Sequence, residues 1–538
     1  MKPRFALSPG ILLWIISLFL LATANLQYFE QTIAVYGIDQ YLPFLISQGV
    51  VLLCAIMLVA TVFSFFLPVR IVAVLFLMIG AVVGFFSDNL GIPIDQDMIR
   101  NVFATDINEA GDLLNWGLVL RVGFLGLLPS ILLFLIPIKP ASLFTRQRRL
   151  AGAAVISVLV AAVSMAPFGN SYASLFREHK PLRYFTNPVH PIYSAIKLAI
   201  DIGGGTVDTT FRPRIKTAII PSDDAEHELV IVVVGETARA DHFGLNGYTR
   251  QTTPKLAKRE NILSFTDMRS CGTSTAVSLP CMFSLDNRSD FAINQASFTE
   301  NTLDVLVKAG VSVLWRDNNT GSQGVASRVT YEYFQDPDIN RQCDAEECRD
   351  IGMLDGLEDY VAQQDGDILI VLHQLGSHGP AYFKRYPDDY AVFEPDCQSK
   401  ELGSCTEAEI INAYDNTILY TDNFLDAAIN FLESKQGRYE TSLIYLSDHG
   451  ESLGEMGVYL HGMPYFVAPE TQTHVPFVIW ASDTSDIDKN QLQARLNDPM
   501  THDDFSKLLL EMFEIIVDEN KIANGSGILP MKPESYHQ

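Results

Sequence analysis

The sequence predicts an N-terminal membrane part of five helices, followed by a larger α/β domain with a mainly parallel β-sheet. Residues 1–214 carry a net charge of +4 and contain five long apolar stretches. The rest of the 538-residue chain holds 23 of the 38 basic and 52 of the 63 acidic residues, a net charge of −29. It also contains short apolar runs that alternate with helical and loop segments, a pattern typical of buried parallel strands. A chain of this length and uneven composition is expected to form at least two separate bodies.

Each apolar stretch of the first part is about long enough to cross a bilayer. The first stretch follows Lys2 and Arg4 and could be taken for a signal peptide, but the four further stretches favour a membrane helix. The third and the fifth stretch are short. The five predicted spans are residues 11–26, 44–67, 71–86, 118–138 and 151–168.

Basic residues between the spans predict their orientation, because such residues concentrate on the cytoplasmic side. Lys2 and Arg4 precede the first span, Arg70 lies in the turn before the third, and a basic group from Lys139 to Arg149 follows the fourth. Acidic residues dominate the other loops. Five spans place the two ends of the chain on opposite sides, so the N-terminus is expected in the cytoplasm and the acidic part outside the cytoplasmic membrane.

The stretch after the last span is rich in aromatic and basic residues, a composition that suits an interfacial helix and linker on the membrane surface. A plain connector is the alternative. The predicted boundaries are therefore 1–170 for the membrane domain, 171–215 for the interfacial helix and linker, and 216–538 for the globular domain.

The seven cysteines agree with a location outside the cytoplasm. Cys54 lies in an apolar run, and the other six fall as near neighbours that could form three local disulfides. A zinc cluster is the alternative, but the sequence contains no C-x2-C pair. The predicted disulfide pairs are Cys271 with Cys281, Cys343 with Cys348, and Cys397 with Cys405.

The charge of the globular part excludes some partners. Nucleic acid normally requires a basic stripe that releases counterions, so we expect no nucleic-acid binding. An acidic surface also offers no general attraction to anionic lipid. An anionic lipid substrate would have to be held locally, by a metal ion or by a few cations.

Polar residues follow several of the predicted strands, where a parallel sheet gathers its chemistry. The strands are expected at 228–234, 311–315, 367–373, 442–447 and 475–480. Glu236 follows the first strand, and Asp448 and His449 follow the fourth. Together they supply two oxygens and a nitrogen for a zinc-like ion, and the Thr275 hydroxyl could complete the tetrahedron.

Thr275 is the candidate nucleophile. It lies in SCGTSTAVSLPC, before a run that could begin a helix and present free backbone N–H groups to a phosphate. An ordinary N-cap is the alternative interpretation. Metal coordination would lower the hydroxyl pKa and stabilise charge on the phosphorus under attack. His378 and His461 are further imidazoles for phosphate or proton transfer, whereas we interpret His474 as structural and His242 as a turn or surface residue.

Several motifs resemble those of the bacterial phosphoethanolamine transferases that modify lipid A and confer polymyxin resistance. The resemblance covers nearly the whole chain. It implies a five-helix membrane domain joined to an alkaline-phosphatase-like (sulfatase-like) periplasmic domain, zinc ligands at Glu236, Thr275, Asp448 and His449, and Thr275 as the phosphoethanolamine acceptor. The motifs are GETARADHFGLNGYTRQTTP, SCGTSTAVSLPCMFS, SHGP, YDNTILYTDNF and LSDHGESLGE.

The resemblance also implies substrate residues. His378 and His461 match histidines that bind substrate or a second metal ion, and Asn101 and Glu109 match polar residues linked with lipid and ethanolamine binding. From the residues alone, Asn101 and Glu109 are ordinary loop residues. Many relatives have GCKGVC where this chain has GSQGVA at 321–326, so the extra disulfide is absent. Gln323 replaces the relatives' lysine, which predicts weaker or altered head-group binding.

The expected reaction is a two-step transfer in a multi-pass protein of the bacterial inner membrane. Thr275 attacks phosphatidylethanolamine, diacylglycerol leaves, and a lipid A phosphate then takes the phosphoethanolamine group. One zinc ion, with a second left open, and a monomer are expected. The alternatives are another envelope glycan as acceptor, a glycerol-phosphate transferase, a sulfatase, which would need a C-x-P-x-R motif that is absent around Cys271, and a non-catalytic membrane sensor.

Overall fold

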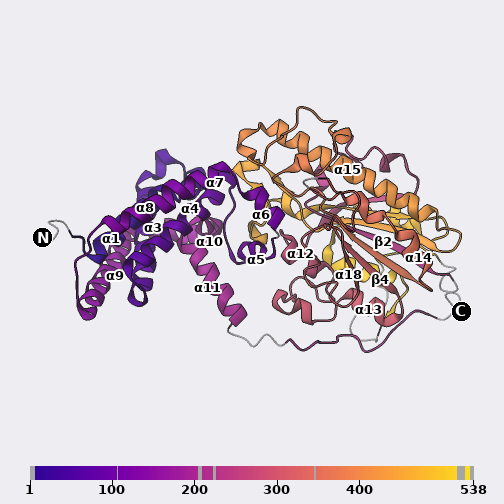
Figure 1. Ribbon diagram of the computed structural model, residues 1–538, viewed down its shortest axis with the longest axis horizontal. Helices are drawn as coiled ribbons and strands as arrows, with labels where there is room; N and C mark the ends of the chain where they lie inside the picture. The colour runs from indigo at the N-terminus through magenta and orange to yellow at the C-terminus, as the bar shows by residue number, and fades with distance from the viewer. Residues whose placement is uncertain are drawn as a thin grey trace. The chain divides into compact units, whose positions relative to one another are not determined.

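The computed structural model describes residues 6–105, 107–203, 209–221, 226–344, 347–517 and 528–532, without the side chains of residues 107–109 (Figure 1). The chain divides into two compact units. The first comprises Met1–Ile99, Leu114–Ile200 and Met456–Val458, and the second Arg100–Leu113, Asp201–Glu455 and Tyr459–Gln538. The Arg100–Leu113 segment thus groups with the second unit, although it falls inside the predicted membrane domain of residues 1–170.

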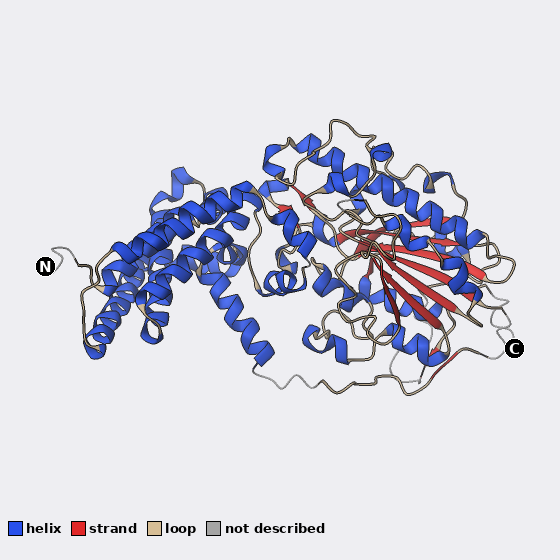
Figure 2. Ribbon diagram, viewed as in Figure 1, coloured by secondary structure: helices blue, strands red, loops and turns tan. Residues whose placement is uncertain are grey.

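The first unit is helical in its described part (Figure 2). In the described residues, four helical stretches are long and apolar enough to cross a membrane, and a fifth is reached only if α1 and α2, bent by 61°, count as one span. The predicted number of five therefore depends on this bent pair. The helices are α1 (Pro9–Thr23), α2 (Leu26–Tyr36), α3 (Ile38–Phe66), α4 (Val69–Leu90), α7 (Trp116–Arg121), α8 (Leu128–Leu135) and α9 (Leu143–Met165).

Polar side chains satisfy the backbone where α1 ends and α2 begins. Asn25 donates from its amide to the carbonyl of Asn187 (2.9 Å), and Asn187 donates in return to the carbonyl of Ala24 (3.0 Å). Asp88 accepts from the backbone N–H of Gln27 (3.0 Å). Buried backbone groups need such partners at a helix break. Side chains from distant parts of the sequence thus satisfy the backbone at this bend, which lies at the end of the predicted span 11–26.

The predicted interfacial segment is mostly helical. It contains α10 (Gly169–Glu178), a 3-10 turn at Lys180–Phe185, and α11 (Val189–Gly203). On α11, Tyr193, Ile196 and Ile200 are exposed apolar side chains. This face is compatible with the predicted place at a membrane surface, which stays a prediction.

The second unit is built on an eight-stranded mixed sheet with the order β11-β3-β10-β7-β2-β6-β4-β5. The five strands from β7 to β5 in this order run parallel, whereas β10 is antiparallel to both β7 and β3. The strands are β2 (Glu228–Gly235), β3 (Ile262–Arg269), β4 (Ser312–Asp317), β5 (Thr330–Tyr333), β6 (Ile368–His373), β7 (Glu440–Ser447), β10 (His474–Ala481) and β11 (Met500–Thr501).

All five predicted strands belong to this sheet, which is mainly parallel as expected. The direction predicted for residues 475–480 was wrong, because they lie in the antiparallel strand β10. The strand β3 was not predicted. Its side chains alternate between buried and partly exposed positions, so it lacks the continuous apolar run of the central strands.

Helices cover both faces of the sheet. On one face, α12 (Thr275–Met282), α13 (Thr302–Ala309) and α18 (His502–Glu511) share a buried core with alternate residues of β2. The long helix α15 (Glu407–Glu433) packs against β7 and β2 (Figure 1). The remaining elements are α5 (Gln96–Ala104), α6 (Ile107–Leu113), α14 (Leu357–Ala362), α16 (Glu470–Thr473), α17 (Lys489–Gln493), β1 (Ala218–Ile219), β8 (Ser452–Leu453), β9 (Tyr459–Leu460) and β12 (Ile516–Val517).

The disulfide prediction is confirmed. Bonds join Cys271 to Cys281, Cys343 to Cys348, and Cys397 to Cys405. Cys54 is a buried free thiol in α3.

Candidate active site

The candidate site lies at the carboxyl ends of two neighbouring strands. β2 and β7 are parallel and pair Gly235 with Ser447 at their last position. Glu236 follows β2 and Asp448 follows β7, and the Asp448 N–H donates to the carbonyl of Gly235 (2.9 Å). This register brings the two carboxylates out of the sheet side by side.

The four predicted metal-site residues converge. One ligand atom each from Glu236, Asp448 and His449 lies within 4.8 Å of the others. His449 Nε2 is 3.4 Å from Glu236 Oε1 and 3.4 Å from Asp448 Oδ2. The Thr275 hydroxyl donates to Glu236 Oε2 (3.0 Å) and lies 3.3 Å from His449 Nε2.

The two carboxylates are arranged as a cation site. Glu236 and Asp448 are fully buried, and Glu236 Oε1 and Asp448 Oδ2 have no hydrogen-bond partner among the described residues. Burial raises the pKa of Glu236, and the charge of Asp448 raises it further. Two buried like charges with free oxygens are costly unless a cation lies between them. The residues therefore fit a bound metal ion.

His449 presents a free nitrogen to this cluster. Its Nδ1–H donates to the carbonyl of Gly450 (2.9 Å), so the Nε2 lone pair faces the carboxylates. Burial lowers the pKa of His449 to about 4, which keeps the ring neutral at pH 7. Two carboxylates, a neutral imidazole and a hydroxyl are donors that zinc accepts.

Thr275 is the first residue of α12, and Ser274 occupies the N-cap position without a side-chain cap bond. The Thr275 hydroxyl is directed to Glu236 and His449 instead of capping its helix. Ser278, one turn later, donates from its hydroxyl to the carbonyl of Asp448. α12 is therefore tied to the loop after β7. Its first turn faces Glu236, Asp448 and His449, which together form the carboxylate cluster.

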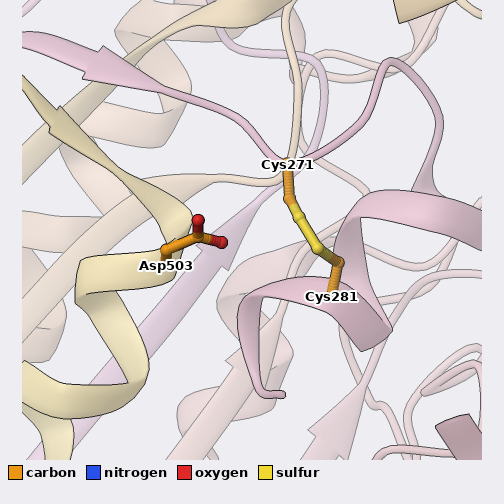
Figure 3. Close-up of side chains that lie close together, drawn as sticks. All are labelled: Cys271, Cys281 and Asp503. Carbon is orange, nitrogen blue, oxygen red and sulfur yellow. A yellow bond between two sulfur atoms is a disulfide. The ribbon is translucent and has the colours of Figure 1, made fainter. Parts of the chain in front are cut away.

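A disulfide fixes the loop before α12. Figure 3 shows Cys271, in this loop, bonded to Cys281 in the last turn of the helix, with Asp503 beside the pair. These three side chains are close enough to hold a metal ion. Sulfurs joined in a disulfide are not thiolate ligands, however, so this cluster serves to fix α12.

The two predicted substrate histidines, His378 and His461, lie beside the carboxylate cluster. The His461 ring centre is 4.4 Å from that of His449 and 5.4 Å from that of His378. His461 Nδ1 donates to Glu451 Oε2 (2.8 Å), and Glu451 Oε1 accepts from the Tyr382 hydroxyl (2.7 Å). Glu451 was given no role in the sequence prediction, although it lies in the same DHGE motif as Asp448.

The His378 loop is linked to the Arg100–Leu113 segment. Arg385 Nε donates to the carbonyl of His378 (2.7 Å), and its Nη2 pairs with Asp112 Oδ2 (3.3 Å). Asn101 lies half-buried in α5, where its carbonyl accepts from the Thr105 N–H (2.9 Å). Glu109 lies in α6, and its side chain is outside the described part of the chain. No described contact places either residue in the carboxylate cluster.

The loop after β4 contains Gln323, which was predicted as a substrate residue, and Asn319, which was not predicted. Gln323 donates to the carbonyl of Thr320 (3.4 Å) within its own turn. Asn319 contacts the cluster, and its amide donates to Glu236 Oε2 (2.8 Å) and to the carbonyl of Gln374 (2.8 Å). The signal for Asn319 was its position two residues after the buried strand β4, whereas Glu236 directly follows β2.

The prediction of a turn or surface position for His242 was only partly right. It lies in a 3-10 turn, but it is buried, and its Nδ1 donates to Asp415 Oδ1 (2.7 Å). Tyr248 and Arg250 also contact Asp415, at 2.9 and 2.8 Å. Two of the sequence motifs are thus joined by a buried carboxylate. His474 donates to the carbonyl of Thr266 (2.8 Å), as a structural residue would.

Comparison with known proteins gives matches along both units. The family described as Sulfatase matches residues 228–515, and the family described as Phosphoethanolamine transferase EptA/EptB matches residues 52–201. The chain is 41% identical over 529 residues to phosphatidylethanolamine transferase Mcr-2 of Escherichia coli, which covers 96% of this chain and 97% of the relative. It is 38% identical over 505 residues to phosphoethanolamine transferase EptA of Escherichia coli K12, which covers 90% of each.

A solved structure is similar over the full length. It is the integral membrane protein lipooligosaccharide phosphoethanolamine transferase A of Neisseria meningitidis, with a TM-score of 0.93 and 32% identity. The match covers 98% of this chain and 100% of that one. The apolar helices and the sulfatase-like domain are therefore found together in one solved relative.

Proposed function

Because the chain belongs to the phosphoethanolamine transferase family, we propose that it transfers phosphoethanolamine from phosphatidylethanolamine to a phosphate group of lipid A. The observation that carries this proposal is the Thr275 hydroxyl, 3.0 Å from Glu236 and 3.3 Å from His449 at the start of a helix. Adding an amine to an anionic phosphate lowers the negative charge of the cell surface. Such a change weakens the binding of cationic polymyxins.

The proposed reaction has two displacements at phosphorus. The Thr275 Oγ forms a bond to the phosphorus of phosphatidylethanolamine, the bond to the glycerol oxygen breaks, and diacylglycerol leaves with the proton. The oxygen of a lipid A phosphate hydroxyl then attacks the same phosphorus, the bond to Oγ breaks, and the proton of that hydroxyl passes to Oγ, so the threonine hydroxyl is restored. Membrane helices favour this chemistry because donor and acceptor are both lipids.

The side chains have separate roles in this proposal. Glu236, Asp448 and His449, with Thr275, would hold one zinc ion, which supplies a lower hydroxyl pKa and stabilises charge on the phosphate. Glu236 Oε2 aligns the hydroxyl through its hydrogen bond. His461, oriented by Glu451, and His378 are placed to bind the phosphate or move a proton to the leaving oxygen. His461 and His378 would also be the ligands of a second metal ion.

We further propose a multi-pass inner-membrane protein with a cytoplasmic N-terminus and a periplasmic catalytic domain from residue 216, after the interfacial segment 171–215. The three disulfides support an oxidising compartment for this domain. Asn101 and Glu109 remain proposed lipid contacts, and Gln323 a proposed site of weaker head-group binding.

The nucleophile is tested by replacing Thr275 with Ala and, as a matched control, with Ser. Mass spectrometry of lipid A from cells that express each variant measures the phosphoethanolamine mass increment. We expect the increment with the wild type, a reduced increment with Thr275→Ser, and none with Thr275→Ala. An unchanged increment in the alanine variant would exclude Thr275 as the nucleophile.

The donor and the acceptor need their own experiment. Purified protein in lipid nanodiscs receives labelled phosphatidylethanolamine or labelled phosphatidylglycerol, with lipid A or an envelope glycan as acceptor. Label transfer from phosphatidylethanolamine to lipid A is expected. Transfer from phosphatidylglycerol would indicate a glycerol-phosphate transferase, and transfer to the glycan would indicate a different acceptor. A protein with neither zinc nor transfer would be a membrane sensor.

A further inference from the structure

We propose that Asp350 is a positioning residue. It fixes Glu236 through two segments that both contact Glu236, the loop after β4 and the turn after β6. Asp350 lies in a buried 3-10 turn and is not part of the carboxylate cluster. The proposal deepens the proposed function, because Glu236 is the side chain that aligns the Thr275 hydroxyl.

Asp350 collects hydrogen bonds from two segments that are distant in sequence. Oδ1 accepts from the side chain of Asn318 (2.8 Å) and the N–H of Leu375 (2.9 Å). Oδ2 accepts from the N–H of Gly376 (3.1 Å) and the side chain of Gln374 (3.3 Å). One carboxylate thus joins the loop after β4 to the turn after β6.

Both segments also contact Glu236. Asn319, next to Asn318, donates to Glu236 Oε2 (2.8 Å), and the Ser377 N–H donates to the Glu236 carbonyl (3.0 Å). Gly376 packs so closely that a Cβ there would lie 2.9 Å from both the N and the O of Glu236. The side chain and the backbone of Glu236 are therefore held by segments that share Asp350 as their common acceptor.

Charge and shape make Asp350 hard to replace. All four of its described hydrogen-bond partners are neutral N–H donors, which a carboxylate can satisfy with both oxygens. An Asn side chain would turn one oxygen into a donor, which would face another donor in a buried place. The Asp350 segment is itself fastened, because Asn318 also donates to the carbonyl of the disulfide-bonded Cys348 (2.9 Å).

The test compares Asp350→Asn with Asp422→Asn in the full-length protein. Asp422 is also buried and accepts two backbone N–H groups, from Lys255 (2.8 Å) and Leu256 (2.9 Å), but these contacts lie outside the candidate site. Four quantities are measured for each variant: hydrogen exchange of a peptide covering residues 374–380, zinc affinity by chelator competition, kcat, and the melting temperature.

We expect Asp350→Asn to speed exchange of the 374–380 peptide at least about tenfold and to cost about 10- to 100-fold in zinc affinity or kcat, as outer ligand-supporting residues do. Asp422→Asn is expected to lower the melting temperature while the other three quantities stay within about twofold of wild type. If Asp350→Asn does not fold, Gln374→Met removes only the longest bond and should shift the same quantities by a smaller factor.

Two results distinguish this inference from the proposed function. Unchanged exchange at residues 374–380, or zinc affinity and kcat equal to those of the Asp422 variant, would overturn the role of Asp350. Absence of transfer by the wild type would overturn the proposed function instead. In that case faster exchange in Asp350→Asn alone would still support Asp350 as the residue that holds this turn.

Discussion

Replacing Gly376 by Ala should misplace the proposed metal ligand Glu236 without replacing any of the proposed ligands. Gly376 has φ +54°, and an added Cβ would lie 2.9 Å from the N and the O of Glu236 and 3.1 Å from its Cβ. Carbon atoms in contact prefer separations of about 3.5 to 4.0 Å, so the turn or Glu236 has to move by roughly 0.5 Å. The substitution therefore acts on the geometry of the site through the backbone.

The expected magnitude has two parts. The left-handed backbone costs about 1–2 kcal/mol for a residue with a Cβ. The displacement of Glu236 should reduce transfer by roughly 10- to 100-fold, because misplacement by about 1 Å can cost a factor near 100. Gly366→Ala is the matched control, since Gly366 has φ +82° and, its chain neighbours apart, no atom of the described residues lies within 4 Å of an added Cβ.

The assay measures diacylglycerol release from phosphatidylethanolamine, together with the melting temperature, for both variants in nanodiscs. Both should lose a similar part of their stability from backbone strain, and Gly376→Ala should lose more because of the contact with Glu236. Only Gly376→Ala should lose most of its activity. Equal activities in the two variants would refute the argument that the close approach of this turn fixes Glu236.

Three further predictions concern protons and charge. In the metal-free protein, burial and the charge of Asp448 raise the pKa of Glu236, so zinc binding should release a proton. The zinc Kd should therefore fall by up to about tenfold for each unit by which the pH rises. Calorimetry in two buffers of different ionisation enthalpy measures the proton release, and its absence would contradict the metal site. Burial lowers the pKa of His502 from 6.5 to about 4. As the pH falls, His502 takes up a proton in the unfolded chain before it does so in the folded protein. Its contribution to the free energy of unfolding should therefore be fully present above pH 6.5 and fall by roughly 3 kcal/mol towards pH 4. Denaturant unfolding of wild type and His502→Gln at pH 7 and 4.5 tests this, and equal losses in the two proteins would count against it. Gln323→Lys should lower the KM for phosphatidylethanolamine about threefold at low salt, with no effect at high salt; a KM that does not change at low salt would show that this turn is remote from the head group.

Part of the candidate site could be predicted from the sequence, because the same residues follow predicted strands and lie in the motifs that resemble the family. Glu236 and Asp448 directly follow buried strands, His449 is the next residue after Asp448, and a parallel sheet brings the ends of its strands together. Asn319, two residues after β4, and Glu451, four residues after β7, were missed. A polar residue after a strand does not reveal its partner, and many such residues only satisfy loop backbone.

Other features were not predictable because they depend on contacts between distant segments. The antiparallel direction of β10 leaves no trace in its apolar pattern, since burial on both faces looks the same in either direction. The bend between α1 and α2 depends on Asn187, far along the chain. His242 was predicted as a turn or surface residue, and its burial was not predicted because its partner Asp415 lies in another motif.

The sequence by itself determined the division into an apolar and an acidic part, the three disulfide pairs, the family, and the residue types gathered for chemistry at phosphorus. These are consequences of composition, spacing and motif, which are local properties of the chain. Only the tertiary structure decided how the site is held: which strand runs antiparallel, which loops clasp Glu236, and that Asp350 joins those loops. A buried polar group takes whichever donors folding brings within about 3 Å, and that choice is made by the packing of the whole sheet.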